Sequence, residues 1–294
     1  MSVTSEAPAA FRSTAARPGP IDLLAEAIRE VISRRRLVRY LVQAEVKKRG
    51  IDTFLGNLWW ILDPLLLMGV YLVLVAVIST RSTPDFPLFL FSAILPWKWF
   101  TVAVADSANS VVSQQRLMKQ IAFPKIILPI ASTTAGVVGF AFGLIPLAAI
   151  MLLYPDRLSL YPVFIPVIAA VQFAFTLAIA ILVAAGNVFV RDLGNVVRHA
   201  LRLWWYLSPG LYSLTLLDDV SLFVDYPILK TIVTANPFAV LFEAYRNVLY
   251  GTPEGPPLMP DLGSLAVLLV ASLVFLAVSV VIFKRLEPNF AKVL

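Results

Sequence analysis

The stretch that decides the fold is KKRGIDTFLGNLWWILDPLLLMGVYLVLVAVI, residues 47–78. In it a basic cluster leads to a tryptophan pair, Trp59-Trp60, and an apolar run then continues to Ile78. Cationic side chains meet anionic lipid headgroups, indoles settle at the membrane interface, and long apolar helices cross the hydrocarbon. The part over 57–79 is roughly 23 residues, or roughly 34 Å of helix, which exceeds a bilayer core of about 30 Å. We therefore predict a membrane-spanning helix here.

The composition of the whole chain is typical of a membrane protein. Of 294 residues, 59% are hydrophobic and only 14% are charged, whereas a soluble domain carries about a quarter. The net charge is +6 at pH 7, but the basic residues lie beside the apolar runs, which favours a role in membrane orientation over nucleic-acid binding. The chain has no Cys, one His and no HExxH or EF-loop pattern, so we expect no metal site or cofactor in it.

Six apolar stretches predict an all-α integral membrane protein whose permease domain covers 51–294. The expected spans are 57–79, 88–112, 126–153, 161–189, 199–217 and 263–283. Basic residues concentrate before the first span, in the second and fourth loops and in the C-terminal tail. By the positive-inside rule, we expect both termini in the cytoplasm.

The N-terminal region divides into two parts. Residues 1–20 are rich in Ala, Ser, Thr and Pro, which predicts a disordered tail rather than a signal peptide. Residues 21–50 have apolar positions at helical spacing but are too polar to span. This pattern favours an amphipathic helix on the cytoplasmic membrane surface over a polar helix packed on soluble neighbours. Its basic residues are Arg34, Arg35, Arg36, Arg39, Lys47, Lys48 and Arg49.

The long segment between the last two spans, 218–262, is expected to be external and to carry short helices. Asn236 suits an N-cap, Pro237 suits the first helical position, and Gly251 can close the C-terminus. At roughly 14 residues this helix is too short to cross a bilayer. We expect this helix either to be partly embedded in the membrane at the external face or only to cap the helix bundle. Its apolar face comprises Phe238, Leu241, Phe242, Tyr245, Val248 and Leu249.

Motifs that carry chemistry are few. The chain has no GxxxxGK[ST] phosphate loop, so we do not expect it to bind ATP in that way. His199 lies beside Arg198 and Arg202 and is interpreted as a membrane-edge residue rather than a catalyst. We identify Asp63 and Asp106 as the ionisable residues inside spans, each near the cytoplasmic end. Those positions argue against a proton- or sodium-driven carrier, so the energy must come from elsewhere.

Aromatic side chains give a further signal. An interfacial belt accounts for any single tryptophan, but sugar rings also stack on aromatic faces. A lining of such rings would suit a glycan conduit, which needs weak and repeated contacts. The candidate rings are Trp59, Trp60, Trp97, Trp99, Phe100, Trp204, Trp205 and Tyr206.

A basic stretch between the second and third spans, 113–125, predicts a short helix that stops before Pro124. A structural turn alone would not need about ten residues, so we favour a helix that docks a soluble partner. Its expected contact residues are Gln115, Arg116, Lys119, Gln120, Phe123 and Pro124.

Four stretches carry a family resemblance. They are LGNLWWILDPL at 55–65, RLMKQIAFP at 116–124, NPFAVLFEAYR at 236–246 and FKRLEPNFA at 283–291. In this order, over about 40–294, they resemble the membrane-spanning permease subunit of bacterial ABC transporters that export polysaccharide, the O-antigen and teichoic-acid exporter family. Asp63 departs from the asparagine usual there, and residues 50–54 lack the family's basic and aromatic run.

The resemblance implies a homodimer in the bacterial plasma (inner) membrane, with an ATP-binding subunit docked under each copy. ATP and magnesium would bind that partner, so this chain would be a transporter subunit and not an enzyme. The substrate would be a glycan on a polyprenyl-diphosphate or similar lipid. Residues 21–50 would form a cytoplasmic gate, and 113–125 would couple to the ATPase. The external gate would contain Asn236, Pro237, Glu243, Tyr245 and Arg246, with Glu243 and Arg246 as a charged pair at i,i+3.

Two alternatives stay open from the sequence. One is a permease of similar architecture that exports a drug or a small lipid. The other is a membrane glycosyl-lipid transferase, for which Asp218-Asp219 is the one acidic pair on a water-facing loop. Turnover of a lipid-linked donor by the purified chain without ATP would favour the enzyme. In each case we expect contacts with membrane lipids and none with nucleic acid.

Overall fold

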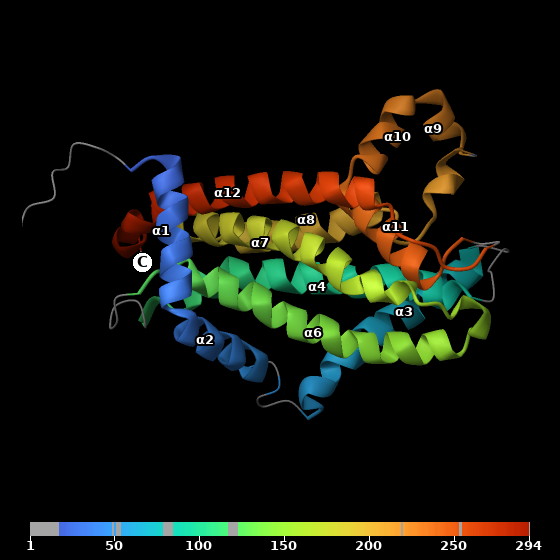
Figure 1. Cartoon of the computed structure of the whole chain (residues 1–294), viewed down its shortest axis with the longest axis horizontal. Coiled ribbons are helices and arrows are strands. Elements are labelled where there is room, and N and C mark those ends of the chain that lie inside the picture. The colour runs from blue at the N-terminus through green and yellow to red at the C-terminus, as the bar shows by residue number, and fades with distance from the viewer. Residues whose placement is uncertain are drawn as a thin grey trace, which may run out of the picture.

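Long helices that run along one axis make up most of the protein (Figure 1). The computed structural model describes residues 18–48, 50, 54–78, 85–116, 123–218, 220–252 and 255–293. These residues form helices and turns without a β-strand, so the expectation of an all-α chain is confirmed. The four longest helices are α4 (Phe86–Ser113), α6 (Ile127–Leu152), α7 (Ile165–Phe189) and α12 (Leu262–Val293).

Five helices of the described chain are long and apolar enough to cross a membrane. They are the four longest helices and α3 (Trp59–Ile78). Each coincides with one of the expected spans to within a few residues, except that α12 continues ten residues beyond 283. A continuous apolar run needs a helix in hydrocarbon because only intrahelical bonds satisfy its backbone.

The expected fifth span, 199–217, is wrong in its bounds. The helix there is α8 (Leu193–Leu207), which has 15 residues, and it is followed by an irregular stretch and a 3-10 turn, η4 (Leu214–Asp218). At about 1.5 Å per residue, α8 is roughly 22 Å long, which is shorter than a bilayer core. Pro209 and Gly210 end the helical run that the apolar sequence suggested.

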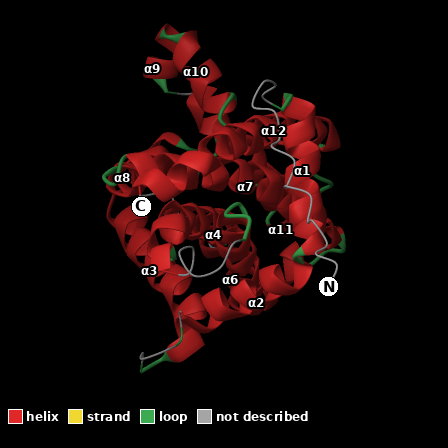
Figure 2. Cartoon of the chain, turned by 90° about the vertical axis from the view of Figure 1, so that its left-hand side faces the viewer, coloured by secondary structure: helices red, strands yellow, loops and turns green. Residues whose placement is uncertain are grey.

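The core is centred on α4, which has α6, α7, α8 and α3 around it when the bundle is viewed end-on (Figure 2). Two buried amides on α7 bond to carbonyls of α4. Gln172 Nε2 donates to Pro96 O at 2.8 Å, and Asn187 Nδ2 donates to Ala108 O at 2.8 Å. Because an unpaired buried amide is costly, these two bonds fix the register of α7 against α4.

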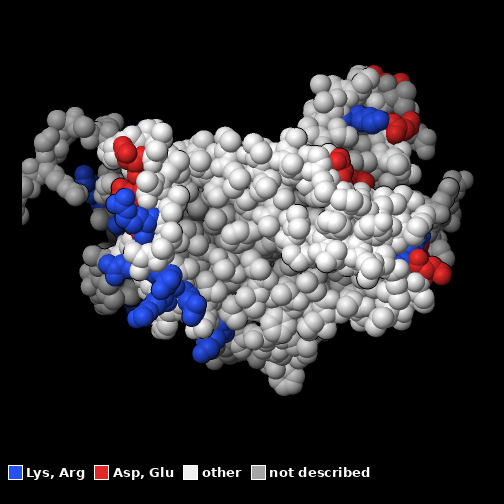
Figure 3. Space-filling model, viewed as in Figure 1, with Lys and Arg blue, Asp and Glu red and all other residues white. Residues whose placement is uncertain are grey.

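The N-terminal amphipathic segment forms two helices rather than one. They are α1 (Pro20–Ser33) and α2 (Arg35–Lys48), which meet at Arg34. Their apolar faces cover α12 and α6, where Ala27 and Leu41 are buried against a cluster that includes Phe283. We call the end of the bundle that holds α1 and the C-terminus the terminal end. Lys and Arg side chains gather there, as Figure 3 shows.

The opposite end of the bundle holds the short helices, and we call it the far end. These are α9 (Ser221–Asp225), α10 (Pro227–Thr234) and α11 (Pro237–Leu249). The α9–α10 pair projects sideways from the bundle (Figure 1). In contrast, the whole expected apolar face of α11 is buried in the core. Asn236 caps α11, since its Oδ1 accepts from Phe238 N–H at 3.0 Å, and Gly251 ends it with φ of 83°.

Candidate functional site

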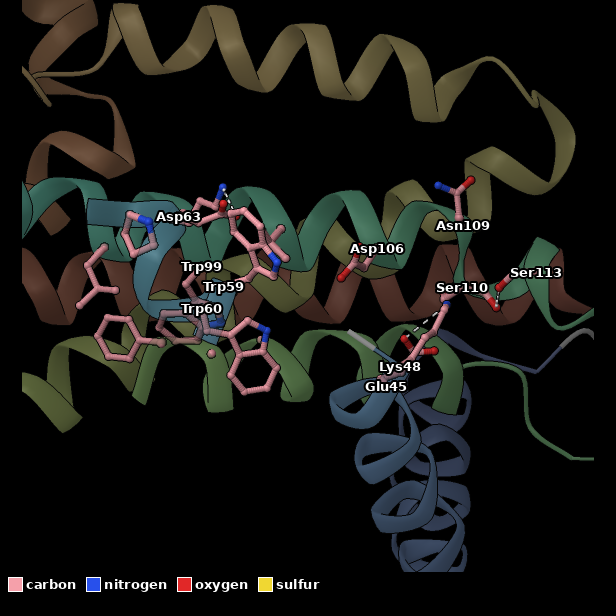
Figure 4. Close-up of a pocket in the computed structure, with 17 residues that line it drawn as sticks. Glu45, Lys48, Trp59, Trp60, Asp63, Trp99, Asp106, Asn109, Ser110 and Ser113 are labelled. Carbon is pink, nitrogen blue, oxygen red and sulfur yellow. Dashed lines mark hydrogen bonds and ion pairs between the residues drawn. The ribbon is translucent and has the colours of Figure 1, made fainter. Parts of the chain in front are cut away.

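A cavity of about 530 Å³ lies between α2, α3, α4 and α6, and we call it the α3–α4 cavity (Figure 4). Its lining combines charged and hydroxyl-bearing side chains with aromatic rings. Pro64, inside α3, is part of its wall, and the polar groups extend in a row from Asp63 past Asp106 to Ser113. The cavity is therefore polar along one side and aromatic at one end.

One face of α4 supplies more of this lining than any other helix. Residues three or four apart lie on the same side of a helix, and the cavity residues of α4 follow that spacing. They are Leu95, Lys98, Trp99, Val102, Asp106, Asn109, Ser110 and Ser113. The opposite face of α4 packs in the core, and Leu95 and Trp99 are buried in that core while they also line the cavity. This spacing is a signal in the sequence that would have identified the site.

An ion pair joins the two helices that give the cavity its name. Lys98 Nζ lies 3.1 Å from Asp63 Oδ2, and both side chains are partly exposed, by 35% and 46%. Our sequence interpretation counted Asp63 and Asp106 as ionisable residues inside spans but left out Lys98. That omission is corrected here, because Lys98 lies within α4 and lines the cavity.

Three of the eight candidate aromatics line the cavity: Trp59, Trp60 and Trp99. The ring of Trp99 also contacts that of Phe140 on α6 in a tilted arrangement, with ring centroids 4.8 Å apart. Gly136 of α6 makes this approach possible, since a Cβ there would lie 3.0 Å from Trp99 Cδ1. Small residues let neighbouring helices, and the side chains between them, come close in this way.

The other candidate aromatics do not line the cavity. Trp97, Phe100, Trp204 and Trp205 pack in the core. The ring centroid of Phe238 lies 4.7 Å from that of Trp97 and 4.6 Å from that of Phe100. Tyr206 is 57% exposed on α8. Of the eight rings expected to share one path, three therefore line one cavity in this conformation, and their contact with a glycan stays a prediction.

The basic residues of the N-terminal segment lie at the surface. Lys48 is the one among the described members that lines the cavity, where its Nζ lies 3.7 Å from Glu45 Oε2. Arg49 falls outside the described residues. The remaining members are exposed at the junction of α1 and α2 and along α2: Arg34, Arg35, Arg36, Arg39 and Lys47.

A charge cluster that the sequence interpretation missed joins α1 to α12. Lys284 Nζ lies 3.0 Å from Glu26 Oε1, 2.9 Å from Glu30 Oε2 and 3.2 Å from Glu287 Oε2. Glu287 also accepts a bond of 2.7 Å from the backbone N–H of Lys125. Burial raises the pKa of Glu30, although Lys284 acts in the opposite direction. One ammonium thus holds three carboxylates from two helices.

The expected docking stretch borders this cluster. Gln115 and Arg116 follow the end of α4, and Phe123 and Pro124 precede α6. Phe123 and Pro124 also line a second cavity, of about 590 Å³, together with Glu30 and Lys284. Two further expected residues of the stretch, Lys119 and Gln120, lie outside the described residues.

At the far end, Arg246 is buried and binds the backbone that follows α8. Its guanidinium donates to Pro209 O at 2.7 Å, Gly210 O at 2.7 Å and Tyr212 O at 3.1 Å. Burial lowers the pKa of Arg246 to about 9, which leaves the guanidinium charged at neutral pH. The expected charged pair with Glu243 is replaced by these carbonyl bonds. Burial raises the pKa of Glu243, and the nearby Arg246 charge partly offsets this effect.

Of the other three residues expected at the external gate, Tyr245 is buried and Asn236 and Pro237 are half-buried. Asn236 joins α8 to α11, since its Oδ1 accepts from Trp204 Nε1 at 3.1 Å and its Nδ2 donates to Ser208 Oγ at 2.7 Å. Pro237 begins α11, and Tyr245 is buried with 1% exposure. The apolar face of α11 therefore packs on the bundle, and the position of this helix relative to the membrane stays a prediction.

The α3–α4 cavity offers hydrogen-bonding groups and ring faces rather than a reactive centre. Carboxylate, amide and hydroxyl groups on α4 can bind hydroxyl-rich molecules, and indoles can stack on sugar rings. Within the described residues, no three His, Cys, Asp or Glu side chains gather in a way that could hold a metal ion. The arrangement is suited to holding a ligand weakly along a path.

Comparisons with known proteins agree with this picture. No family model matches the chain. It is 32% identical over 265 residues to the O-antigen export system permease protein RfbA of Myxococcus xanthus, which covers 90% of this chain and 98% of that protein. Two proteins of the same name from Klebsiella pneumoniae are 25% identical over 259 and 260 residues, covering 88% of this chain and 95% of each.

Proposed function

Because the chain belongs to the family of O-antigen export permeases, we propose that it is the transmembrane subunit of an ATP-driven ABC transporter that exports a lipid-linked polysaccharide. The glycan would pass from the cytoplasm to the outer face of the inner membrane. In this proposal ATP and magnesium bind a separate subunit, present in two copies, and two copies of this chain surround the path.

The observation that carries the proposal is the α3–α4 cavity. It combines Trp59, Trp60 and Trp99 with a row of polar groups on α4. Sugars present both apolar C–H faces and hydroxyl groups, so a lining of this kind suits a glycan better than a purely apolar drug. Because α3 has an exposed apolar face, with Val70 64% and Val77 80% exposed, a second copy has room to close the path there.

The proposed topology has six crossings and cytoplasmic termini. The concentration of Lys and Arg at the terminal end supports this orientation. In addition to the five long helices, α8 and the irregular stretch after it would form one further crossing, the fifth in chain order. The carbonyls of that irregular stretch bond to Arg246. Non-helical backbone at membrane depth needs such partners. The docking stretch 113–125 would then face the ATP-binding subunit.

Export by reconstituted vesicles tests the proposal. The chain and its ATP-binding subunit are placed in inside-out vesicles, and ATP-dependent uptake of lipid-linked glycan is measured. We expect Trp60→Ala to reduce uptake severalfold while the complex still assembles, because stacking of one sugar on a ring contributes about 1 kcal/mol. Tyr161→Ala, a surface aromatic outside the cavity, is the matched control and should leave uptake unchanged.

Two results would contradict the proposal. One is ATP-dependent transport of a small lipid or drug with no transport of glycan, which would favour the alternative permease. The other is that Trp60→Ala and Tyr161→Ala reduce glycan uptake equally, which would show that the transported glycan does not contact the α3–α4 cavity.

A further inference from the structure

The C-terminal motif FKRLEPNFA, residues 283–291, has no role in the proposed glycan path. It forms turns of α12 at the terminal end of the bundle, where α1 lies across α12 (Figure 1). Phe283 and Phe290 are fully buried there, and Lys284 and Glu287 are each only 8% exposed. Buried Lys and Glu side chains are rare unless they are paired, so the partners of these two show what the motif connects.

On one side the motif binds α1. Lys284 Nζ donates to both carboxylate oxygens of Glu30, at 3.0 and 2.9 Å, and lies 3.0 Å from Glu26 Oε1. An ion pair that is shielded from water is broken at a much higher cost than one at the surface, because the remaining charge is left buried. The end of α12 is therefore firmly attached to α1.

On the other side the motif binds the last residue of the expected docking stretch. Glu287 Oε1 accepts the backbone N–H of Lys125 at 2.7 Å, and Glu287 Oε2 lies 3.2 Å from Lys284 Nζ. A hydrogen bond to a carboxylate is about twice as strong as one between neutral groups. Three successive polar contacts thus connect the main chain at Lys125 to Glu30 on α1, through Glu287 and Lys284.

We propose that Glu287 and Lys284 couple the docking stretch 113–125 to α1. The proposal rests on the proposed function, in which the ATP-binding subunit contacts that stretch. A displacement of the docking stretch pulls on the carboxylate of Glu287, because the N–H of Lys125 belongs to the main chain. Lys284 lies one turn away on the same helix and passes the displacement to α1, which is part of the expected cytoplasmic gate. Both are positioning residues, since neither is placed to contact ATP or the glycan.

The number of glycans exported for each ATP hydrolysed tests the coupling. It is measured in vesicles that hold the full-length chain and its ATP-binding subunit. Glu287→Ala removes both contacts, so ATP hydrolysis should continue while this ratio falls about fivefold or more. Glu287→Gln keeps an oxygen for the N–H of Lys125 but weakens the contact with Lys284, and its ratio should be intermediate. Arg285→Ala is the matched control, since Arg285 is exposed on the same turn, and should leave the ratio unchanged.

Hydrogen exchange of α1 measures the transmission directly. In the unmodified chain, trapping the ATP-binding subunit with ADP and vanadate should change the protection of Pro20–Ser33. Glu287→Ala should lose this response although the subunit stays bound. The melting temperature in detergent identifies a variant that simply fails to fold, and Glu287→Gln then takes its place in both measurements.

The outcomes distinguish this proposal from the proposed function. If Glu287→Ala exports as many glycans per ATP as Arg285→Ala, or if its α1 still responds to the trapped subunit, the coupling role is wrong and the export function stands. If ATP drives no glycan export by the unmodified chain, the proposed function is wrong and the coupling falls with it. A lower ratio together with a silent α1 in an assembled Glu287→Ala complex supports the proposal.

Discussion

Arg246 is the residue whose contacts best explain how α8 ends inside the protein. The helix stops at Leu207, and the next carbonyls have no helical partners. The planar guanidinium of Arg246 reaches three of them at once, and its Cζ lies 3.7 Å from the centre of the Phe89 ring. A cation in this position replaces the hydrogen bonds that the irregular backbone has lost, so one side chain of α11 stabilises the stretch at which Pro209 and Gly210 end the helix.

Replacing Arg246 should therefore destabilise the whole bundle. Arg246→Leu leaves the carbonyls of Pro209, Gly210 and Tyr212 without this donor, and we expect a loss of about 3–5 kcal/mol, measured as a lower melting temperature in detergent. Arg246→Lys should recover only part of it, because an ammonium lacks the fork geometry. The exposed Arg198→Leu is the control and should melt like the unmodified chain. A leucine variant that melts no lower than this control would contradict the account.

At the scale of elements, α1 is held to α12 by charges as well as by apolar contacts. The cluster around Lys284 has three carboxylates and one ammonium, which leaves a surplus of negative charge in a poorly hydrated place. Burial consequently raises the pKa of Glu30 above its ordinary value of 4.5. A raised folded-state pKa means that protonated Glu30 favours the docked helix, so its stabilising contribution is complete below 4.5 and is lost as the pH rises through the raised value.

The docking of α1 should thus depend on pH with a known sign. Hydrogen exchange, corrected for its intrinsic pH dependence, should show greater protection of Pro20–Ser33 at about pH 5 than at about pH 7. Glu30→Gln removes the titrating group and should abolish the difference. Protection that instead rises with pH, or a pH dependence that persists in Glu30→Gln, would show that another group controls this contact.

Across the whole molecule, the sequence predicted most of the helices because hydrocarbon leaves an apolar run few choices. Thus α4, α6, α7 and α12 were expected nearly where they lie. The end of α8 was not, because the bonds that stabilise the irregular backbone after it come from Arg246, a residue far along the chain. The division of the N-terminal segment at Arg34 also depends on packing against two different helices.

The site was also only partly predictable, because contacts between residues far apart in the sequence decide which side chains line the cavity. Trp97 and Trp99 are two residues apart, so on a helix they point to nearly opposite sides. Both rings are buried, but Trp97 packs against Phe238 and does not reach the cavity, whereas Trp99 lines it. Lys98 was overlooked between these rings, although it stands on the same face as Asp106.

The most direct test of the central claim asks what the α3–α4 cavity contacts during export. A photoreactive amino acid is placed at Val102, which lines the cavity, or at Val274, which is 61% exposed on α12, and cells are irradiated while they export glycan. We predict a crosslink to lipid-linked glycan at Val102 that depends on an active ATP-binding subunit, and none at Val274. Continued export with no adduct at Val102, or with equal adducts at both positions, would contradict the claim that the glycan passes through this cavity.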